Sequence, residues 1–404
     1  MTTPDITPFK ISIPDTVLER IRSKLSISLD DDDLPVEVEE GDQWTRGTPN
    51  SEIHRLAKYW RDEFDWRKVE TRLNTELPQF TTKIEVDGFG TFDIHFVHAR
   101  TEVPKNAAIP LIFVHGWPGS FLEVSKILPL LLEDESGQEP RFHVVAPSLV
   151  NFGFSQGCVK PGFGVEQHAE MCHKLMLKLG YDQYVTQGGD LGYFVTRIMA
   201  LKYPVHIQAQ HINMAIPAEP TSTSHPDLFA KCQSTPLNDW EKAAAERTVH
   251  TLRTGMGYYN IQATKTQTIA IAVTASPLGL LAWIYEKLHD WTDGYPWTEE
   301  EVLTWVCIYA YSTAGAAASM RIYYEETNQK GGGSSVVTAQ RDTGKTVKIG
   351  VSQFPAELTP PRELWLHTLG NVVYIKQHAR GGHLAAWEVP ELLVDDVRGT
   401  FRGR

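Results

Sequence analysis

The chain reads Gln187-Gly188-Gly189-Asp190-Leu191-Gly192 between an apolar stretch at 184–186 and a longer apolar run at 193–200. This order predicts a strand, a sharp turn and a helix, with Asp190 at the tip of the turn. Glycines on both sides of the tip let the backbone adopt a strained conformation that presents the central side chain to solvent. The pattern is that of a nucleophile elbow in which aspartate stands where serine is usual.

Aspartate at the tip changes the chemistry that such an elbow can perform. A serine that attacks a saturated carbon leaves an ether, which hydrolysis does not release, whereas a carboxylate leaves an ester that activated water can cleave. Asp190 therefore indicates displacement at a saturated carbon. From this motif alone, the alternative is an aspartate that caps a helix after a glycine turn.

Apolar runs that are typical of buried strands occur on both sides of the elbow. The runs at 111–114 and 142–147 fit strands covered on both faces of a parallel sheet, and 165–179 carries apolar residues at helical spacing. Further strand-like runs follow at 347–351 and 372–375. Strands that alternate with helices predict an α/β fold with a mostly parallel central sheet.

The same pattern divides the chain into four segments. An N-terminal meandering arm with two helical stripes spans 1–105, and the first part of the α/β core spans 106–215. Residues 216–325 are mainly helical and aromatic, which predicts a lid inserted between sheet strands. The second part of the core spans 326–404.

Composition narrows the range of partners and locations. The 404 residues carry a net charge of −12, which argues against nucleic acid and anionic membranes as partners. Four cysteines show no C-x-x-C spacing, so we expect free thiols in a reducing compartment. Without a signal peptide or an apolar span of about 20 residues, the sequence predicts a soluble cytoplasmic protein with no membrane anchor. We expect neither a metal nor a cofactor.

A carboxylate nucleophile needs a base that activates water and an acid that orients the base. His383 lies in a Gly-Gly-His sequence after the last predicted strand, and Glu357 follows the strand before it. Both fall at the carboxyl ends of parallel strands, where open α/β sheets bind ligands, and the order nucleophile, acid, histidine is that of α/β-hydrolases. Three other carboxylates lie in this part of the chain: Asp342, Glu363 and Glu388.

A His-Gly-Trp-Pro turn that contains Trp117 follows the first core strand. Such a turn can direct the Trp117 N–H into the site opposite the N–H of Leu191, so that two donors hold the charge of an ester oxyanion. A tight turn with Trp117 as packing is the alternative. Downstream, Ser120 and Glu123 fit a capping box for a helix at 122–132.

Together these motifs resemble those of the microsomal-type epoxide hydrolase family of the α/β-hydrolase superfamily. The resemblance covers nearly the whole chain and implies an α/β-hydrolase fold with Asp190 as nucleophile, His383 as base and Glu357 as acid. The motifs that carry it lie at 64–67, 73–74, 115–120, 188–192, 257–265, 276–282 and 380–388.

The resemblance also implies two lid tyrosines that hold the epoxide oxygen. Tyr258 corresponds to the first, and the second is Tyr323, with Tyr324 as the alternative. A phenol can donate to the strongly basic alkoxide that ring opening creates. The expected reaction adds water to an apolar epoxide and gives a vicinal diol through a covalent aspartyl ester. A homodimer is possible by resemblance.

Two rival functions remain open at this point. A haloalkane-type dehalogenase shares the Asp–His–acid core, but it needs N–H donors that hold a halide, and the Leu191 side chain offers none. The other rival is a non-catalytic receptor with an α/β-hydrolase fold. Complete core motifs argue against a receptor, and any turnover that vanishes in Asp190→Ala would exclude it.

Overall fold

The computed structural model describes residues 5–30, 34–35, 43–101, 108–133, 137–328 and 334–402. Within these residues one sheet of nine strands runs through the core. The strands β1, β2, β3 and β5 pair antiparallel, whereas β5, β4, β6, β7, β8 and β9 pair parallel, as the sequence predicts. In sheet order the strands are β1 (Ile6–Pro8), β2 (Gln79–Val86), β3 (Gly90–Ala99), β5 (Arg141–Pro147), β4 (Ala108–Val114), β6 (Tyr184–Gly188), β7 (Ile207–Ile212), β8 (Lys348–Gln353) and β9 (Asn371–Gln377).

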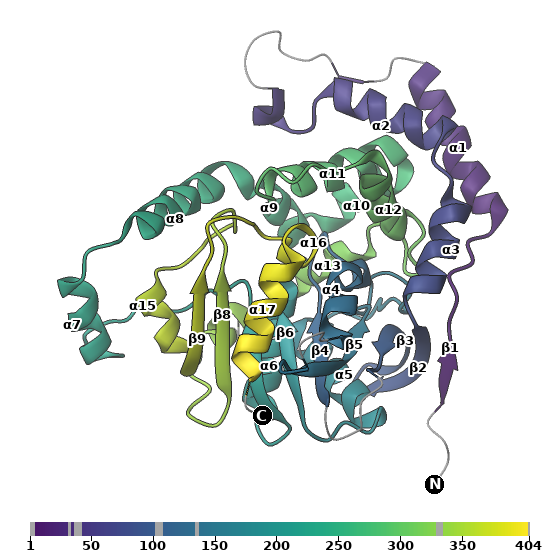
Figure 1. The fold of residues 1–404 in the computed structure, drawn as a ribbon. Helices are drawn as coiled ribbons and strands as arrows, with labels where there is room; N and C mark the ends of the chain where they lie inside the picture. The colour runs from purple at the N-terminus through teal and green to yellow at the C-terminus, as the bar shows by residue number, and fades with distance from the viewer. Residues whose placement is uncertain are drawn as a thin grey trace.

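Helices cover both faces of the parallel strands. On one face α5 packs against α6, and on the other α17 packs against α4 (Figure 1). The central strands β4 and β5 are mostly buried and apolar because helices cover both of their faces. The elements around this part of the sheet are η2 (Phe121–Glu123), α4 (Val124–Leu132), α5 (Val165–Lys178), α6 (Leu191–Lys202), α14 (Ser335–Ala339), α15 (Glu363–Leu366), η5 (His367–Leu369), α16 (Ala385–Glu388) and α17 (Pro390–Phe401).

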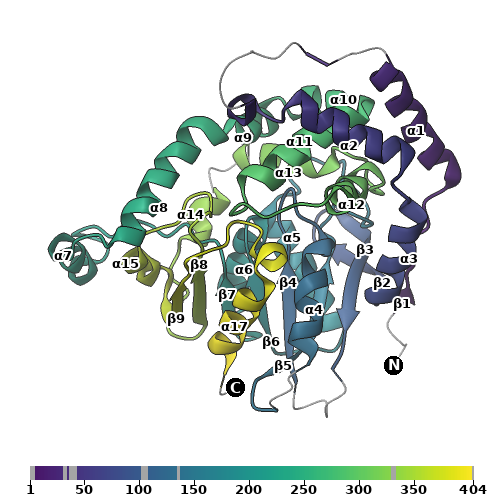
Figure 2. The same cartoon turned by 45° about the horizontal axis from the view of Figure 1, so that its top comes forward.

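A group of helices, which we refer to as the lid, lies between β7 and β8. Figure 2 shows α9 to α13 above the end of the sheet at which the parallel strands finish. Within the described ranges, no single helix has the length and apolarity to cross a membrane, although α10 and α11, bent by 115°, pass that test as a pair. The lid elements are α7 (Pro226–Ser234), α8 (Asp239–His250), η3 (Thr251–Gly255), α9 (Gly257–Thr264), α10 (Thr266–Ala275), α11 (Pro277–Asp290), α12 (Glu299–Ala310), η4 (Ala318–Met320) and α13 (Arg321–Thr327).

The N-terminal arm runs along the sheet edge and then over the lid. Its elements after β1 are α1 (Asp15–Asp30), η1 (Gln43–Arg46), α2 (Asn50–Asp62) and α3 (Trp66–Glu76). Helices α1 and α2 contact α11 of the lid, and α2 also contacts α12 (Figure 1). The N-terminal arm therefore packs on the outer side of the lid.

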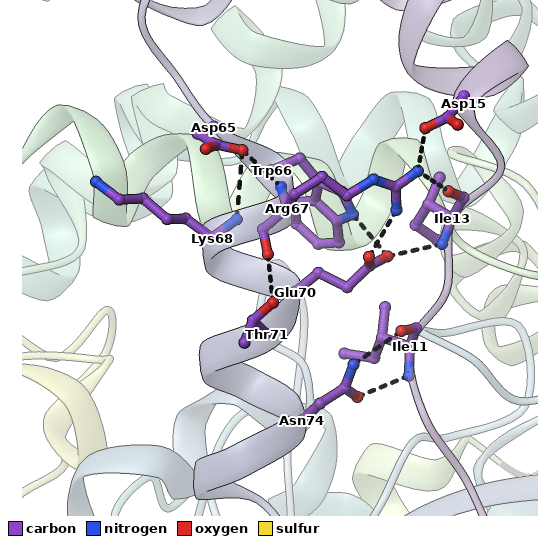
Figure 3. A network of polar contacts seen from close by, with 10 residues as sticks. All are labelled: Ile11, Ile13, Asp15, Asp65, Trp66, Arg67, Lys68, Glu70, Thr71 and Asn74. Carbon is purple, nitrogen blue, oxygen red and sulfur yellow. Dashed lines mark hydrogen bonds and ion pairs between the residues drawn. The ribbon is translucent and has the colours of Figure 1, made fainter.

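A polar network fixes the start of the arm to α3 (Figure 3). The Asn74 side chain exchanges two hydrogen bonds of 2.8 Å with the Ile11 backbone, as a neighbouring strand would. One Glu70 carboxylate oxygen accepts from Ile13 N at 2.7 Å and from the Trp66 indole at 3.1 Å. Arg67 joins both sides, because its guanidinium contacts Glu70 at 2.6 Å and donates to the Ile13 carbonyl at 2.6 Å.

Candidate active site

Asp190 occupies a strained turn between β6 and α6. Its backbone has φ of +49°, in the left-handed region that a residue with a side chain rarely adopts. The turn is tight because α6 approaches β4 closely: a Cβ on Gly192 would lie 1.9 Å from the Val114 carbonyl oxygen. The strained elbow that the sequence predicts is therefore present, and strain of this kind is often found at functional sites.

The structure brings Asp190, His383 and Glu357 into one hydrogen-bonded chain. His383 Nε2 lies 3.1 Å from Asp190 Oδ2, and His383 Nδ1 lies 2.6 Å from Glu357 Oε1. The side chains of His383 and Glu357 are 1% and 3% exposed, while that of Asp190 is 17% exposed and lines a cavity. The arrangement thus exposes Asp190 to the cavity and keeps its two partners out of water.

None of the three competing carboxylates contacts His383 within the described residues. Glu388 accepts hydrogen bonds from Gly382 N and Asp293 N, and Asp342 accepts one from Gly344 N. Glu363 is half-buried on α15 and its backbone N–H donates to Glu241. The geometry therefore selects Glu357.

The two carboxylates determine the protonation of His383. Burial alone would lower the pKa of the imidazole, but Glu357 and Asp190 hold that pKa well above its usual value. His383 is therefore protonated while Asp190 carries its charge. Neutralising the Asp190 carboxylate would lower the pKa of His383, because one of the two charges that raise it would be gone.

The turn that follows β4 is held against Asp190 as predicted. Trp117 N donates to Asp190 Oδ1 at 2.7 Å, and a Cβ on Gly116 would lie 2.3 Å from that carboxylate. The lid fixes this turn from outside, because Trp305 and Tyr309 of α12 donate to the Pro118 and Gly119 carbonyls. Leu191 begins α6 directly after Asp190, where a helix has free N–H groups.

Tyr258 and Tyr323 meet across the same cavity. Their rings are 6.0 Å apart, and the Tyr258 ring stacks on the Trp117 indole at 5.1 Å with an interplanar angle of 8°. Tyr323 is 6% exposed and lines the cavity with Asp190, whereas the alternative, Tyr324, is 39% exposed. Burial, together with Asp190, raises the pKa of both Tyr258 and Tyr323 well above the usual 10, so both phenols stay protonated.

The cavity between core and lid has a volume of about 610 Å³ and mostly apolar walls. Tyr258 and Tyr323 lie on the lid side, and Asp190 lies on the core side. Apolar walls with few polar groups are typical of small-molecule sites. The remaining wall includes Leu191, Phe194, Met214, Ile216, Leu252, Met256, Ile322 and Leu358.

The sequence did not reveal how Glu123 is placed. Ser120 caps the η2 turn by accepting from Leu122 N at 3.2 Å, and α4 begins only at Val124. The Glu123 carboxyl lies against Gly119, since its Oε1 is 1.7 Å from the position of a Cβ there. Burial and the nearby Asp190 charge raise the pKa of Glu123 to about 8. The capping-box pattern of Ser120 and Glu123 did not indicate that the Glu123 carboxyl is buried near Asp190.

Trp291 is a second residue that the sequence did not single out. It begins the loop after α11, and its carbonyl accepts from His383 N at 2.8 Å. Its ring lies edge-on to the His383 imidazole at 5.0 Å and to the Tyr258 ring at 5.0 Å. The lid therefore supports the histidine as well as the tyrosines.

Comparisons with known proteins agree with this geometry. The family described as epoxide hydrolase N terminus matches residues 6–124, and the alpha/beta hydrolase fold matches residues 109–256. Epoxide hydrolase 1 of Oryctolagus cuniculus is 33% identical over 97% of this chain and 88% of its own length. Juvenile hormone epoxide hydrolase 1 of Ctenocephalides felis is 32% identical over 97% of this chain and 84% of its own length.

Solved structures give the same result. The Aspergillus niger epoxide hydrolase superposes with a TM-score of 0.82 at 31% identity, covering 98% of this chain and 96% of that one. The juvenile hormone epoxide hydrolase of Bombyx mori superposes with a TM-score of 0.86 at 29% identity, covering 98% and 94%. The chain is therefore an enzyme of the microsomal-type epoxide hydrolase family, within the α/β-hydrolase superfamily.

Proposed function

We propose that the enzyme adds water to apolar epoxides through a covalent ester on Asp190 and releases vicinal diols. One observation carries this proposal: Asp190 lies between the Trp117 N–H and His383 on one side and a cavity with two buried tyrosines on the other. A carboxylate in that position can attack a carbon whose oxygen the tyrosines hold.

Ring opening is the first step. An Asp190 oxygen attacks an epoxide carbon, the C–O bond breaks, and the oxygen takes a proton from the tyrosine pair. Because burial and Asp190 raise the pKa of the two phenols, Tyr258 and Tyr323 remain protonated donors in neutral solution. Two positioned donors also polarise the C–O bond before it breaks.

Hydrolysis of the ester is the second step. His383, oriented by Glu357, removes a proton from water, and the resulting hydroxide attacks the Asp190 ester carbonyl. The Trp117 N–H, 2.7 Å from Asp190 Oδ1, and the Leu191 N–H hold the oxyanion. Collapse of this intermediate breaks the carbonyl carbon–alkoxy bond, and the leaving alkoxide takes the proton that His383 holds, which releases the diol. The Asp190 carboxyl then loses its proton to the tyrosine that ring opening had ionised, which restores the starting state.

A trapping experiment tests this mechanism. His383→Gln should form the ester but hydrolyse it slowly, so intact-mass analysis should show one substrate adduct, and peptide mapping should place it on Asp190. His383→Gln combined with Asp190→Ala is the matched control and should stay unmodified. An unmodified Asp190 peptide in the single variant under saturating epoxide would reject the ester mechanism.

Isotope labelling is an independent test. In water enriched in heavy oxygen, single turnover should place label in the Asp190 carboxylate, because water attacks the ester carbonyl and not the substrate carbon. Diol formed without label in Asp190 would contradict the proposal.

Measuring the reaction products distinguishes an epoxide hydrolase from a dehalogenase. A halide needs N–H donors, and the tyrosines supply O–H donors suited to an oxygen leaving group. Diol should form from styrene-type and aliphatic epoxides, while halide release from matched haloalkanes should be absent. Chiral analysis of the diols would add the enantiopreference.

We keep a cytoplasmic location and a possible homodimer as further proposals. The location rests on the four free cysteines, of which Cys158, Cys172 and Cys307 are buried, and on the acidic net charge. Fractionation of the native host and sedimentation analysis would test the two proposals separately.

A further inference from the structure

A buried lysine lies behind the lid tyrosine. Lys287 of α11 is 3% exposed, which is unusual for lysine because burial of a charge is costly. Its ammonium forms an ion pair with Glu286, whose side chain is 27% exposed. The burial of Lys287 thus requires an explanation beyond its neighbouring carboxylate.

Three aromatic rings surround this ammonium. Lys287 Nζ lies 5.0 Å from the centre of the Tyr258 ring, 5.9 Å from that of Trp291 and 6.0 Å from that of Trp283. A cation over an aromatic face is attracted by the electron-rich ring, and the attraction grows when water is excluded. The shortest of the three contacts is to Tyr258, the ring that faces Asp190 across the cavity.

Resting on the proposed function, we propose that Lys287 is a positioning residue that makes Tyr258 the stronger proton donor of the tyrosine pair. As Asp190 attacks the epoxide carbon and the C–O bond breaks, the Tyr258 phenol proton moves to the epoxide oxygen. The ring then carries phenolate charge 5.0 Å from the ammonium centre. Ionisation of Asp190 after ester hydrolysis supplies the proton that restores the phenol.

The charge over Tyr258 acts mainly on the transition state. A neutral phenol attracts the ammonium through its quadrupole alone, whereas an ionising phenol attracts it as an opposite charge. An interaction that strengthens as the reaction proceeds increases the rate, because it lowers the barrier. Glu286 pairs with the ammonium but lies nearer to solvent, which screens its carboxylate.

Other ionisable groups also lie near Tyr258 and affect how easily its phenol loses a proton. Asp190 and Glu357 disfavour a phenolate on Tyr258 by their negative charge, and the phenols of Tyr259 and Tyr323 are also its neighbours. Burial raises the pKa of Tyr258 well above 10, and the charges of Asp190 and Glu357 add to this effect, whereas the hydrogen bond with Tyr323 lowers the pKa. The Lys287 ammonium counters them from the lid side.

The chain contains a matched control away from the tyrosine pair. Lys126 lies 4.7 Å from the centre of the Tyr295 ring and 4.2 Å from that of Trp387, with Glu301 at 2.9 Å. This second cluster has the same combination of lysine, carboxylate and aromatic rings, but its phenol does not line the Asp190 cavity. Lys126→Met therefore measures what loss of such a cluster does to packing alone.

The experiment separates the two chemical steps in the full-length enzyme. With enzyme in excess over a styrene-type epoxide, rapid quenching measures ester formation and ester hydrolysis for wild type, Lys287→Met, Lys287→Arg and Lys126→Met. We expect Lys287→Met to slow ester formation roughly tenfold and to leave hydrolysis within about twofold. Lys287→Arg should restore most of the rate, and Lys126→Met should leave both steps within about twofold.

A pH profile adds a readout that packing does not move. Loss of a nearby cation raises the pKa of a phenol, so the alkaline limb of ester formation should shift to higher pH in Lys287→Met. Should Lys287→Met not fold, Lys287→Gln is the second neutral variant, since its amide can still donate to Glu286. Unchanged ester formation in a folded neutral variant, equal slowing of both steps, or an unmoved alkaline limb would each overturn the proposal.

Tyr258→Phe distinguishes failure of this inference from failure of the proposed function. If Tyr258→Phe slows ester formation and the neutral Lys287 variants do not, the epoxide mechanism stands and the role of Lys287 is rejected. If wild type itself forms no ester, the proposed function is rejected instead.

Discussion

Two buried histidine–carboxylate pairs lie near the ends of β8 and β9, and they differ in what completes them. In the first pair, His383 contacts Glu357 at 2.6 Å and turns its other nitrogen toward Asp190, which is open to the cavity. In the second, His378 contacts Asp396 of α17 at 2.6 Å, and both side chains are at most 7% exposed.

Neighbouring side chains surround the carboxylate of the second pair, His378 and Asp396, which we call the closed pair. Asp396 also accepts from the Ser352 hydroxyl at 2.5 Å and from the Tyr374 hydroxyl at 2.7 Å, and His211 lies 3.0 Å from Ser352. These hydroxyls satisfy the Asp396 carboxylate, whereas the third partner in the first pair, Asp190, faces a cavity. The comparison teaches that composition alone does not define an active site: a histidine–carboxylate pair becomes reactive when its third partner faces a cavity.

We call the His383–Glu357 pair the open pair, because its third partner, Asp190, faces the cavity. The largest effect should come from removing Asp190. Asp190→Ala removes the proposed nucleophile, so kcat/KM should fall by about 10⁵-fold, as expected when a covalent nucleophile is lost. Diol formation is measured by chromatography, and the melting temperature checks the fold. Asp239→Ala on the surface of α8 is the control, and near-normal turnover by Asp190→Ala would remove the nucleophile assignment.

Replacing the acid of the open pair should have the next largest effect. Glu357→Gln keeps the size of the side chain but no longer stabilises the imidazolium, so ester hydrolysis should slow by about 10³- to 10⁴-fold. Ester formation should change by less than about tenfold, so adduct should accumulate in single-turnover measurements.

Glu363→Gln provides the matched control for the acid. This residue was a competing candidate in the sequence and has no contact with His383 among the described residues. It should retain hydrolysis within about twofold. If Glu363→Gln accumulated ester and Glu357→Gln did not, the assignment of the acid would be wrong.

Much of the open pair was predictable from local sequence. The glycines around Asp190 predict the strained turn, and the strands before Glu357 and His383 predict that all three meet at one edge of the sheet. The choice of Tyr323 over Tyr324 needed the fold, because only burial distinguishes these neighbours. The boundaries of the four segments at 105, 215 and 325 stay predictions.

The environment of the site was not predictable from local sequence. Glu123 is distant in sequence from Asp190, and its burial depends on how η2 packs behind the Trp117 turn. Lys287 lies in the mostly apolar helix α11, and its position over the ring of Tyr258 in α9 arises only when the chain folds. Such contacts between distant segments arise from tertiary packing, which no local pattern encodes.

Breaking the closed pair should change stability and not chemistry. Asp396→Asn removes the charge that His378, Ser352 and Tyr374 surround, which should lower the free energy of unfolding by about 2 to 3 kcal/mol. Urea unfolding measures this loss. The turnover of folded enzyme should stay within about twofold, and a selective loss of ester hydrolysis would show that the two pairs are coupled.

The smallest expected effect concerns stability as the pH changes: the contributions of the two pairs to the free energy of unfolding should change in opposite directions. Although burial opposes it, hydrogen bonds from His378, Ser352 and Tyr374 lower the pKa of Asp396 below 3.8. The contribution of Asp396 to stability is therefore complete above that pH and is lost as the pH falls through the lowered value. Accordingly, the stability gap between wild type and Asp396→Asn should narrow toward acid.

His383 has the opposite dependence. Its pKa in the folded protein lies well above 6.5, so its contribution is complete below 6.5 and is lost as the pH rises through the raised value. The gap between wild type and His383→Gln should thus narrow toward alkaline pH, by about 1 kcal/mol for each unit of pKa difference that is crossed. Urea unfolding of wild type and the two variants at pH 2.5, 6 and 9.5 measures both gaps. If both stability gaps narrowed toward the same end of the pH range, His383 would not hold the proton that the charges of Glu357 and Asp190 stabilise.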